Sequence, residues 1–296
     1  MAKRSKHTGL AAKAKKQKKD VKEPSNELKV ELSETVDAED EFAQLQALWK
    51  TYSSLEKESP AVINGVIHEC DRLLRNSESV PASFHATYGL ALGELAKFHT
   101  EEDQEGSVKD FFDAALERLD SGLESHPDNA EIKFAKARVL IDRLPLQYIS
   151  QIEDDGSNAA EFPALDKLLD DALELYESAE EAAESDLFNM DTLEILQAFD
   201  DLLDMVDNFG KDEEEENDKE DDDDEDRKDD EDEEGADDLL SENHPLYNIK
   251  NSDKYNQWWR DRTEAFLERV NPREDHLEVS DLRRELNKRL GQSYLQ

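Results

Sequence analysis

Cysteine is nearly absent from this chain, since Cys70 is the only one among 296 residues. A single thiol excludes a framework of internal disulfides and is compatible with a reducing compartment. Long apolar runs are absent as well: no window approaches the roughly 18 apolar residues of a membrane span, and the N-terminal residues lack the apolar core of a signal peptide. The sequence therefore predicts a soluble, intracellular protein.

The usual motifs of catalysis and cofactor binding are missing too. The sequence contains no Gly-rich phosphate loop, no nucleophile elbow and no array of Cys/His pairs. The histidines show no ligand spacing with one another. Residues 68–71 read His-Glu-Cys-Asp, but consecutive side chains on a helix point about 100° apart and cannot converge on one metal ion. We therefore predict a protein that is not an enzyme and has no catalytic residues, no metal and no cofactor.

Positive charge is scarce. Lys and Arg together number 36 against 77 Asp and Glu, which gives a net charge of −41. The imbalance is uneven, because residues 1–22 carry a net charge of +8 and residues 211–238 a net charge of −17. An acidic body repels nucleic-acid phosphates, so the composition disfavours direct nucleic-acid binding and favours basic protein partners.

These shifts in composition divide the chain into four parts. We predict a disordered basic arm over residues 1–36, a helical repeat body over 37–210, an acidic disordered insertion over 211–240, and C-terminal helices over 241–296 that complete or truncate the repeats. The acidic insertion fits a solvated linker, or a decoy for a basic partner such as a ribosomal protein or a histone.

The basic arm contains a lysine cluster, whose members are Lys13, Lys15, Lys16, Lys18 and Lys19. Such a cluster is typical of a nuclear localisation signal, although it also fits a non-specific solubilising tail. We predict the nucleus as the main location of the protein and leave shuttling to the cytoplasm open.

Two apolar patterns near the start of the body predict a helical hairpin. In residues 41–55 and again in residues 62–75, apolar side chains recur at the spacing of a helix. Ser59 and Pro60 lie between them, and these residue types favour a helix N-cap and the first helical turn respectively. The stripes consist of Phe42, Leu45, Leu48, Tyr52 and Leu55 in the first helix, and of Val62, Val66, Cys70 and Leu73, flanked by Ile63, Ile67 and Leu74, in the second.

More helices follow along the body. Residues 82–98 carry one stripe of large apolar side chains and one of small side chains, and the small stripe predicts that a neighbouring helix approaches closely. Another helix begins after Ser107, and helices are expected near residues 129–144, 163–183 and 186–208. The large stripe is Phe84, Tyr88, Ala91, Leu95 and Phe98, the small stripe is Ala82, Ala86, Gly89, Gly93 and Ala96, and the core positions of the next helix are Phe112, Ala115, Leu119 and Gly122.

Small, large, small and Pro at positions 115, 119, 122 and 127 resemble the second half of a tetratricopeptide repeat, and the L-G-x-x-Y sequence at 290–294 resembles the first half. No convincing alternating strand is present. The sequence therefore predicts an all-α fold: an irregular tetratricopeptide-like helical-hairpin solenoid with a disordered N-terminal arm and an acidic insertion. An unrelated helical bundle is the alternative.

Two adjacent tryptophans stand near the C-terminus. Residues 251–253 read Asn-Ser-Asp, a capping cluster, and predict a helix that contains Trp258, Trp259 and Arg262. Adjacent side chains on a helix diverge by about 100°, so only one indole is expected in the core. The other either anchors a partner or packs under a neighbouring loop. Trp258, Trp259 and Arg262 are therefore the candidate partner-binding residues.

The last apolar stripe of the chain consists of Leu282, Leu286, Leu290 and Tyr294. In a complete repeat a second helix would cover this stripe, but few residues follow it. We expect it to fold back on the preceding helix, to pair with another copy in a weak homodimer, or to meet a partner.

Part of the predicted hairpin also resembles a known family. The residues ALWKTY at 47–52 and VINGVIHECDRLLR at 62–75 resemble the signature of the fungal enhancer of translation termination proteins, whose fission-yeast relatives are negative regulators of a prolyl-hydroxylase-like dioxygenase. The resemblance implies a nuclear, non-enzymatic scaffold that promotes accurate stop-codon recognition and restrains that 2-oxoglutarate-dependent dioxygenase in hypoxic gene regulation. Its partners would be the dioxygenase and ribosome-associated or basic ribosomal proteins. The alternative is an acidic chaperone or nuclear import adaptor for a basic ribosomal protein.

Overall fold

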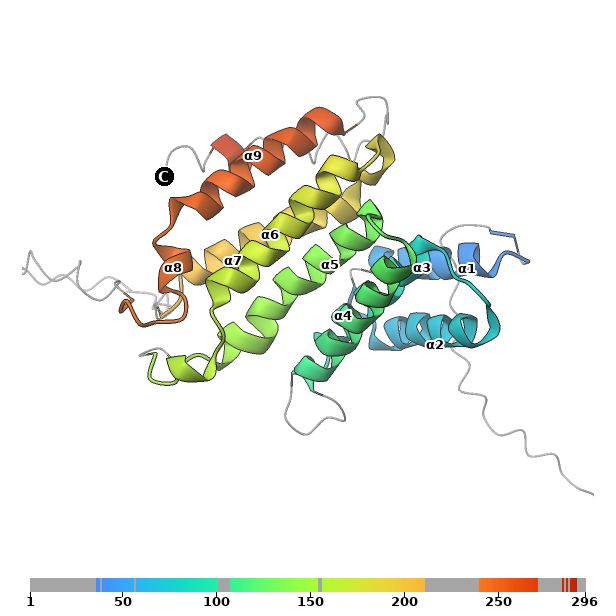
Figure 1. Ribbon diagram of the computed structural model, residues 1–296, viewed down its shortest axis with the longest axis horizontal. Helices are drawn as coiled ribbons and strands as arrows, with labels where there is room; N and C mark the ends of the chain where they lie inside the picture. Colours follow the sequence, from blue (N-terminus) through green and yellow to red (C-terminus); the bar gives the residue numbers. More distant parts are fainter. Residues whose placement is uncertain are drawn as a thin grey trace, which may run out of the picture.

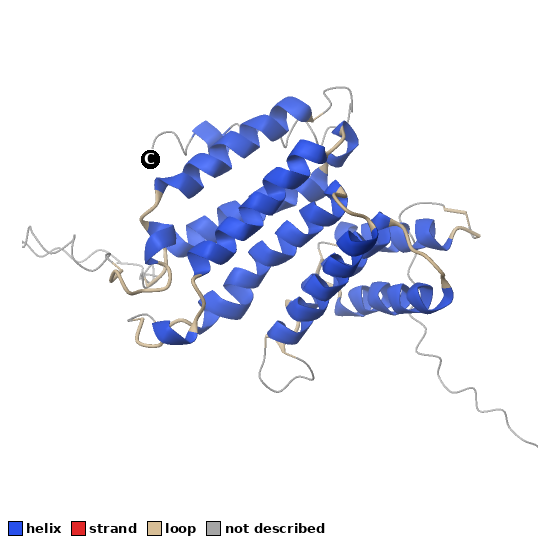
Figure 2. Cartoon of the chain, viewed as in Figure 1, coloured by secondary structure: helices blue, strands red, loops and turns tan. Residues whose placement is uncertain are grey.

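The computed structural model describes residues 36–37, 39–55, 57–100, 107–153, 156–210 and 240–270, together with residues 284, 286 and 288–291. Within these ranges all regular structure is helical and no strand is present (Figure 2), so the prediction of an all-α fold is confirmed. The lysine cluster at residues 13–19 and the acidic residues 211–239 lie outside the described ranges.

The helices are α1 (Glu41–Ser54), α2 (Pro60–Asn76), α3 (Ala82–Ala96), α4 (Val108–Ser125), α5 (Ala130–Arg143), α6 (Leu165–Ala182), α7 (Met190–Asp207), α8 (Tyr247–Lys250) and α9 (Asp253–Arg269). A π-helical turn (Leu144–Tyr148) continues α5, and 3-10 turns occupy Ile149–Gln151, Ala159–Glu161 and Ser185–Leu187. No helix in the described part of the chain is long and apolar enough to cross a membrane.

The predicted hairpin is confirmed as α1 and α2. Ser59 is the N-cap of α2, where its hydroxyl accepts a hydrogen bond from the Val62 N–H at 3.4 Å, and Pro60 occupies the first turn. Cys70 is fully buried on the apolar face of α2, as expected of a core thiol. Leu55 was assigned wrongly to the core stripe: α1 ends one residue earlier, and the Leu55 side chain is 48% exposed.

The stripe of small residues on α3 allows close packing, as predicted. A Cβ atom built on Gly89 would lie 2.4 Å from Cγ of Leu119 on α4, and one built on Gly93 would lie 3.3 Å from Cγ2 of Val139 on α5. Since real Cβ atoms do not approach other atoms as closely as 2.4 Å, only glycine fits at position 89 without a shift of Leu119. α3 therefore lies against α4 and α5 at once.

The later helices begin at capping residues. Ser107 and Asp110 form a capping box at the start of α4. Asn129 accepts a hydrogen bond from the Ile132 N–H at 3.0 Å at the start of α5, and Asn189 caps α7 in the same way. The three helices expected near residues 129–144, 163–183 and 186–208 correspond to α5, α6 and α7, except that a 3-10 turn takes the place of the first residues of the third.

Three hydrophobic clusters follow one another along the array of helices. The first lies among α1, α2 and α3, the second among α3, α4 and α5, and the third among α5 to α9. α3 contacts α5, α5 contacts α7 and α7 contacts α9, in addition to contacts between successive helices from α1 to α6 and between α7 and α8. Figure 1 accordingly shows the helices in chain order, from the α1–α2 hairpin to α9.

Two residues of the predicted C-terminal stripe are described by the structure. Leu286 is 3% exposed and Leu290 is 6% exposed, and both belong to the third cluster. Leu282 and Tyr294 lie outside the described residues. The two described members are covered by their own chain, which agrees with the first of the three expected alternatives, a stripe that folds back, and not with a weak homodimer through these residues.

Candidate functional site

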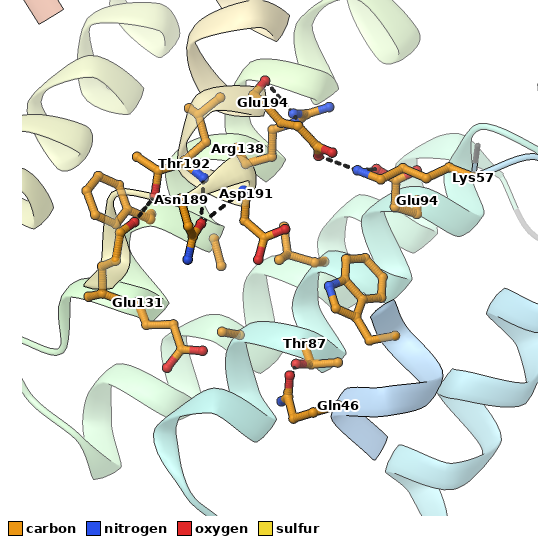
Figure 3. Close-up of a pocket in the computed structure, with 17 residues that line it drawn as sticks. Gln46, Lys57, Thr87, Glu94, Glu131, Arg138, Asn189, Asp191, Thr192 and Glu194 are labelled. Carbon is orange, nitrogen blue, oxygen red and sulfur yellow. Dashed lines mark hydrogen bonds and ion pairs between the residues drawn. The ribbon is translucent and has the colours of Figure 1, made fainter. Parts of the chain in front are cut away.

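A cleft opens between α1, α3, α5 and the start of α7 (Figure 3). Its cavity volume is about 90 Å³, which is the scale of one long side chain. Apolar and charged side chains share its walls, and the helices that contribute them are far apart in the sequence. The lining residues are Gln46, Trp49, Lys57, Ala86, Thr87, Leu90, Glu94, Glu131, Phe134, Ala135, Arg138, Leu187, Asn189, Asp191, Thr192, Glu194 and Ile195.

Lys57, in the turn between α1 and α2, spans the cleft. Its backbone has a φ of 57°, in the left-handed region that non-glycine residues rarely adopt. The Tyr52 hydroxyl donates to the Lys57 carbonyl at 2.9 Å, which supports this conformation. The Lys57 ammonium forms an ion pair with Glu194 of α7 and lies 4.0 Å from Glu94 of α3. The first hairpin is thereby tied to α7 across the cleft.

Arg138 completes the ion pairing at this end of the cleft. Its Nε donates to Asp142 Oδ2 at 2.8 Å, and one terminal nitrogen lies 3.7 Å from Glu194 Oε2. Glu94, whose side chain is 5% exposed, accepts from Lys97 at 2.9 Å. Carboxylates and cations therefore balance one another here, as buried charges require.

Glu131 and Asp191 are in a different situation. Their carboxylates point into the cleft (Figure 3), and neither forms an ion pair or a hydrogen bond with any residue that the structure describes. Burial raises the pKa of Glu131, and Asp191 and Asp186 raise it further. Burial also raises the pKa of Asp191, followed by repulsion from Glu194, and Lys57, Lys50 and Arg138 lower it by less. The Asp191 residue as a whole is exposed at the mouth of the cleft. A positive charge between the two carboxylates would relieve both effects.

A second hollow adjoins the cleft and shares with it the wall made by Lys57, Arg138 and Glu194. Its volume is about 480 Å³. Apolar side chains line much of it, among them Leu146 and the 44% exposed Met205, and its three cations match its three carboxylates in number. The cleft is thus acidic, whereas the adjoining hollow is electrically balanced.

The structure places the predicted tryptophans on α9, away from this cleft. The Trp259 indole is 4% exposed and donates to the Leu196 carbonyl at 3.2 Å. Trp258 is half-buried, donates to Glu177 Oε1 at 2.8 Å, and has its ring centroid 5.2 Å from that of Tyr176. The prediction that only one of the two is a core residue is confirmed. Partner binding by the pair stays a prediction.

Arg262 pairs with a buried carboxylate. Its Nη1 lies 2.6 Å from Glu180 Oε2, and Arg269 lies 3.4 Å from the other oxygen of the same group. The Glu180 side chain is only 3% exposed. The contact fixes α9 against α6 and gives Arg262 a structural role beside the predicted one.

We expect Arg262→Ala to lower the free energy of unfolding by about 2 kcal/mol, because Glu180 would keep only its weaker partner in a buried setting. Urea denaturation followed by circular dichroism measures the change. Arg262→Lys keeps the charge and should lose less. Unchanged stability in the alanine variant would mean that Glu180 does not depend on Arg262.

Sequence reasoning missed the cleft. Glu131 and Asp191 each stand two residues after an asparagine N-cap, where acidic residues are common because they interact favourably with the helix dipole. Nothing local distinguishes them from other first-turn carboxylates in a chain with 77 Asp and Glu. Within the described ranges no group of three or more His, Cys, Asp or Glu side chains is arranged to hold a metal ion.

Comparisons with known proteins point to one family. A family model described as "Nuclear pore complex subunit Nro1" matches residues 1–296. "Enhancer of translation termination 1" of Debaryomyces hansenii is 48% identical over 336 aligned residues, which cover 98% of this chain and 74% of that protein. The protein of the same name from Meyerozyma guilliermondii is 53% identical over 312 residues, which cover 100% and 72% respectively.

Solved structures are more distant. The S. pombe nuclear import adaptor Nro1 is 17% identical, with a TM-score of 0.47 over 90% of this chain and 80% of that one. A second structure, described as a hypoxic regulator of sterol synthesis that is a nuclear import adaptor, is 20% identical with a TM-score of 0.46 over 86% and 74%.

Proposed function

The chain belongs to the family of enhancer of translation termination 1 and Nro1 proteins, and from this premise we propose that it is a non-enzymatic binding scaffold required for correct translation termination. The observation that carries the proposal is the 48% identity over 98% of the chain to a protein named for that role. The description of the family model, a nuclear pore complex subunit, supports a nuclear association.

We propose that the scaffold acts through the cleft and the adjoining hollow. The helix pairs would be degenerate tetratricopeptide-like repeats, in which the first helix of each pair lines a groove for a segment of a partner. Two observations support this reading: α3, α5 and α7 pack in succession, and the cleft is lined from α1, α3, α5 and α7.

The partner that the family resemblance implies is the prolyl-hydroxylase-like dioxygenase. Binding would restrain this enzyme in hypoxic gene regulation and would link the scaffold to the ribosomal protein that the dioxygenase modifies. The lysine cluster from Lys13 to Lys19 would direct the complex to the nucleus.

An acidic chaperone or import adaptor for a basic ribosomal protein is the second candidate. The net charge of −41, concentrated in residues 211–238, favours it. In this alternative the acidic residues, and not the cleft, would make the principal contact.

Salt dependence separates the two candidates. The experiment is a pull-down with the purified dioxygenase at low and at high salt. Binding in the cleft buries apolar surface and should persist at high salt, because salt screens exposed charge pairs and leaves apolar burial intact. The full chain and a variant without residues 211–238 should then bind alike. Binding that disappears at high salt, or with the deletion, would favour the acidic chaperone. Absence of binding under all conditions would contradict the proposed partner.

A further inference from the structure

We propose that the cleft receives a single lysine or arginine side chain of a partner protein segment, with its cation between Glu131 and Asp191. The proposal rests on the binding function proposed above and specifies the chemistry that the cleft recognises. The occupant is a basic residue within a peptide segment of the partner.

Charge complementarity selects this occupant. The lining contains two cations, Lys57 and Arg138, and four carboxylates. Both cations already pair with Glu194 at one end of the cleft. No described cation is among the groups that act on Glu131, and neither Glu131 nor Asp191 has an ion pair among the described residues. Lys57, Lys50 and Arg138 attract Asp191, but burial and the repulsion from Glu194 outweigh them, so one positive charge from outside would complete the pairing.

Glu131 and Asp191 lie in first helical turns, where the helix dipole stabilises an ionised carboxylate. The dipole does not explain why both carboxylates enter the same cleft. A helix N-terminus stabilises a carboxylate that faces solvent equally well. Here one carboxylate comes from α5 and the other from α7, and both enter the same cleft. Burial and repulsion from neighbouring acids make the ionised forms less favourable there: Asp191 raises the pKa of Glu131, and Glu194 raises that of Asp191.

The size and walls of the cleft fit a long amphipathic side chain. Trp49, Leu90 and Phe134 supply apolar surface next to the carboxylates. Lysine and arginine bury a hydrocarbon stem against apolar surface and keep a charged head at a polar site. An aliphatic residue would leave the carboxylates unpaired, and an acidic residue would repel them. The adjoining hollow with Met205 lies where a neighbouring residue of the same segment can pack.

The test removes the two charges while keeping the shape of the side chains. The double variant Glu131→Gln/Asp191→Asn in the full chain should bind the purified dioxygenase about tenfold more weakly than the wild type, because the partner cation would lose both counterions in a partly desolvated site. The control Glu117→Gln/Glu124→Gln removes the same charge from exposed positions on α4 and should bind as the wild type does.

A second arm leaves the scaffold unchanged. Overlapping 15-residue peptides that cover the dioxygenase sequence are tested against the wild-type chain, and each bound peptide is retested with single Lys→Gln and Arg→Gln substitutions. One substitution should remove most of the binding to the wild type and should have little further effect on the Glu131→Gln/Asp191→Asn variant.

The outcomes distinguish the inference from the function on which it rests. Equal binding by the wild type and the cleft variant, or peptides that tolerate every Lys and Arg substitution, would overturn the inference while the binding function stands. Failure of the wild type to bind the dioxygenase or any of its peptides would overturn the proposed function and the inference with it.

Discussion

Trp259→Ala is expected to lower the free energy of unfolding by about 3–5 kcal/mol, among the largest effects of any single substitution in this chain. The Trp259 side chain is 4% exposed and lies in the cluster that joins α7 to α9. Its removal would leave a cavity and would also remove the hydrogen bond from the indole to the Leu196 carbonyl. Chemical denaturation followed by helical circular dichroism measures the loss.

Trp258→Ala is the matched comparison. This ring is half-buried beside Tyr176 and Phe199, so its removal should lower the free energy of unfolding by less, about 1–3 kcal/mol. Trp259→Phe, which keeps most of the buried ring area, should lose about 1 kcal/mol. Equal effects of the two alanine substitutions would contradict the assignment of Trp259 to the core and Trp258 to its edge.

The comparison also separates two roles that the sequence could not separate. If Trp258 anchors a partner, its alanine variant should bind that partner more weakly than its small loss of stability explains. If Trp258 only attaches α9 to α6, binding should follow stability. The hydrogen bond from Trp258 to Glu177 gives it a structural contact in the free protein, which a partner-binding indole would not need.

Local signals predicted the helices well because the residues that determine them are near neighbours. The apolar spacing of Val62, Val66 and Cys70 and the cap at Ser59 depend on a single helix, and each is found as expected. The error at Leu55 has the same origin. Periodicity locates the face of a helix but not the residue at which the helix ends, so the last apolar position was counted as core.

The cleft could not be predicted in this way, because its chemistry depends on which helices meet. Lys57 and Glu194 are 137 residues apart in the chain, and their ion pair follows from the stacking of four helices. The burial of Leu286 and Leu290 is similar: the sequence identified an apolar stripe but not the surface of its own chain that covers it. Fold class and helix positions were therefore accessible from the sequence, whereas the binding surface was not.

The contact between Gly89 and Leu119 provides the second large effect. Leu119→Ala is expected to lower the free energy of unfolding by about 2–5 kcal/mol, because the side chain is fully buried where α3 and α4 meet. Gly89→Ala should also destabilise the protein: its new Cβ would lie within 2.8 Å of three Leu119 carbons, and overpacking of this kind costs about 1–3 kcal/mol against a helix-propensity gain of about 1 kcal/mol.

Combining the two substitutions should reverse the sign of the glycine effect. The atoms that block a Cβ at position 89 are Cγ, Cδ1 and Cδ2 of Leu119, and Leu119→Ala removes all three. Gly89→Ala should therefore stabilise the Leu119→Ala protein, since it fills part of the cavity and favours the helix.

Gly65→Ala is the control: no atom lies within 4 Å of its Cβ, so it should stabilise both the wild type and the Leu119→Ala protein by about 1 kcal/mol. A double-mutant cycle from denaturation measures the coupling, expected to be about 1–3 kcal/mol. Additive effects would mean that the Leu119 side chain does not determine the effect of Gly89→Ala, which would contradict the assigned contact.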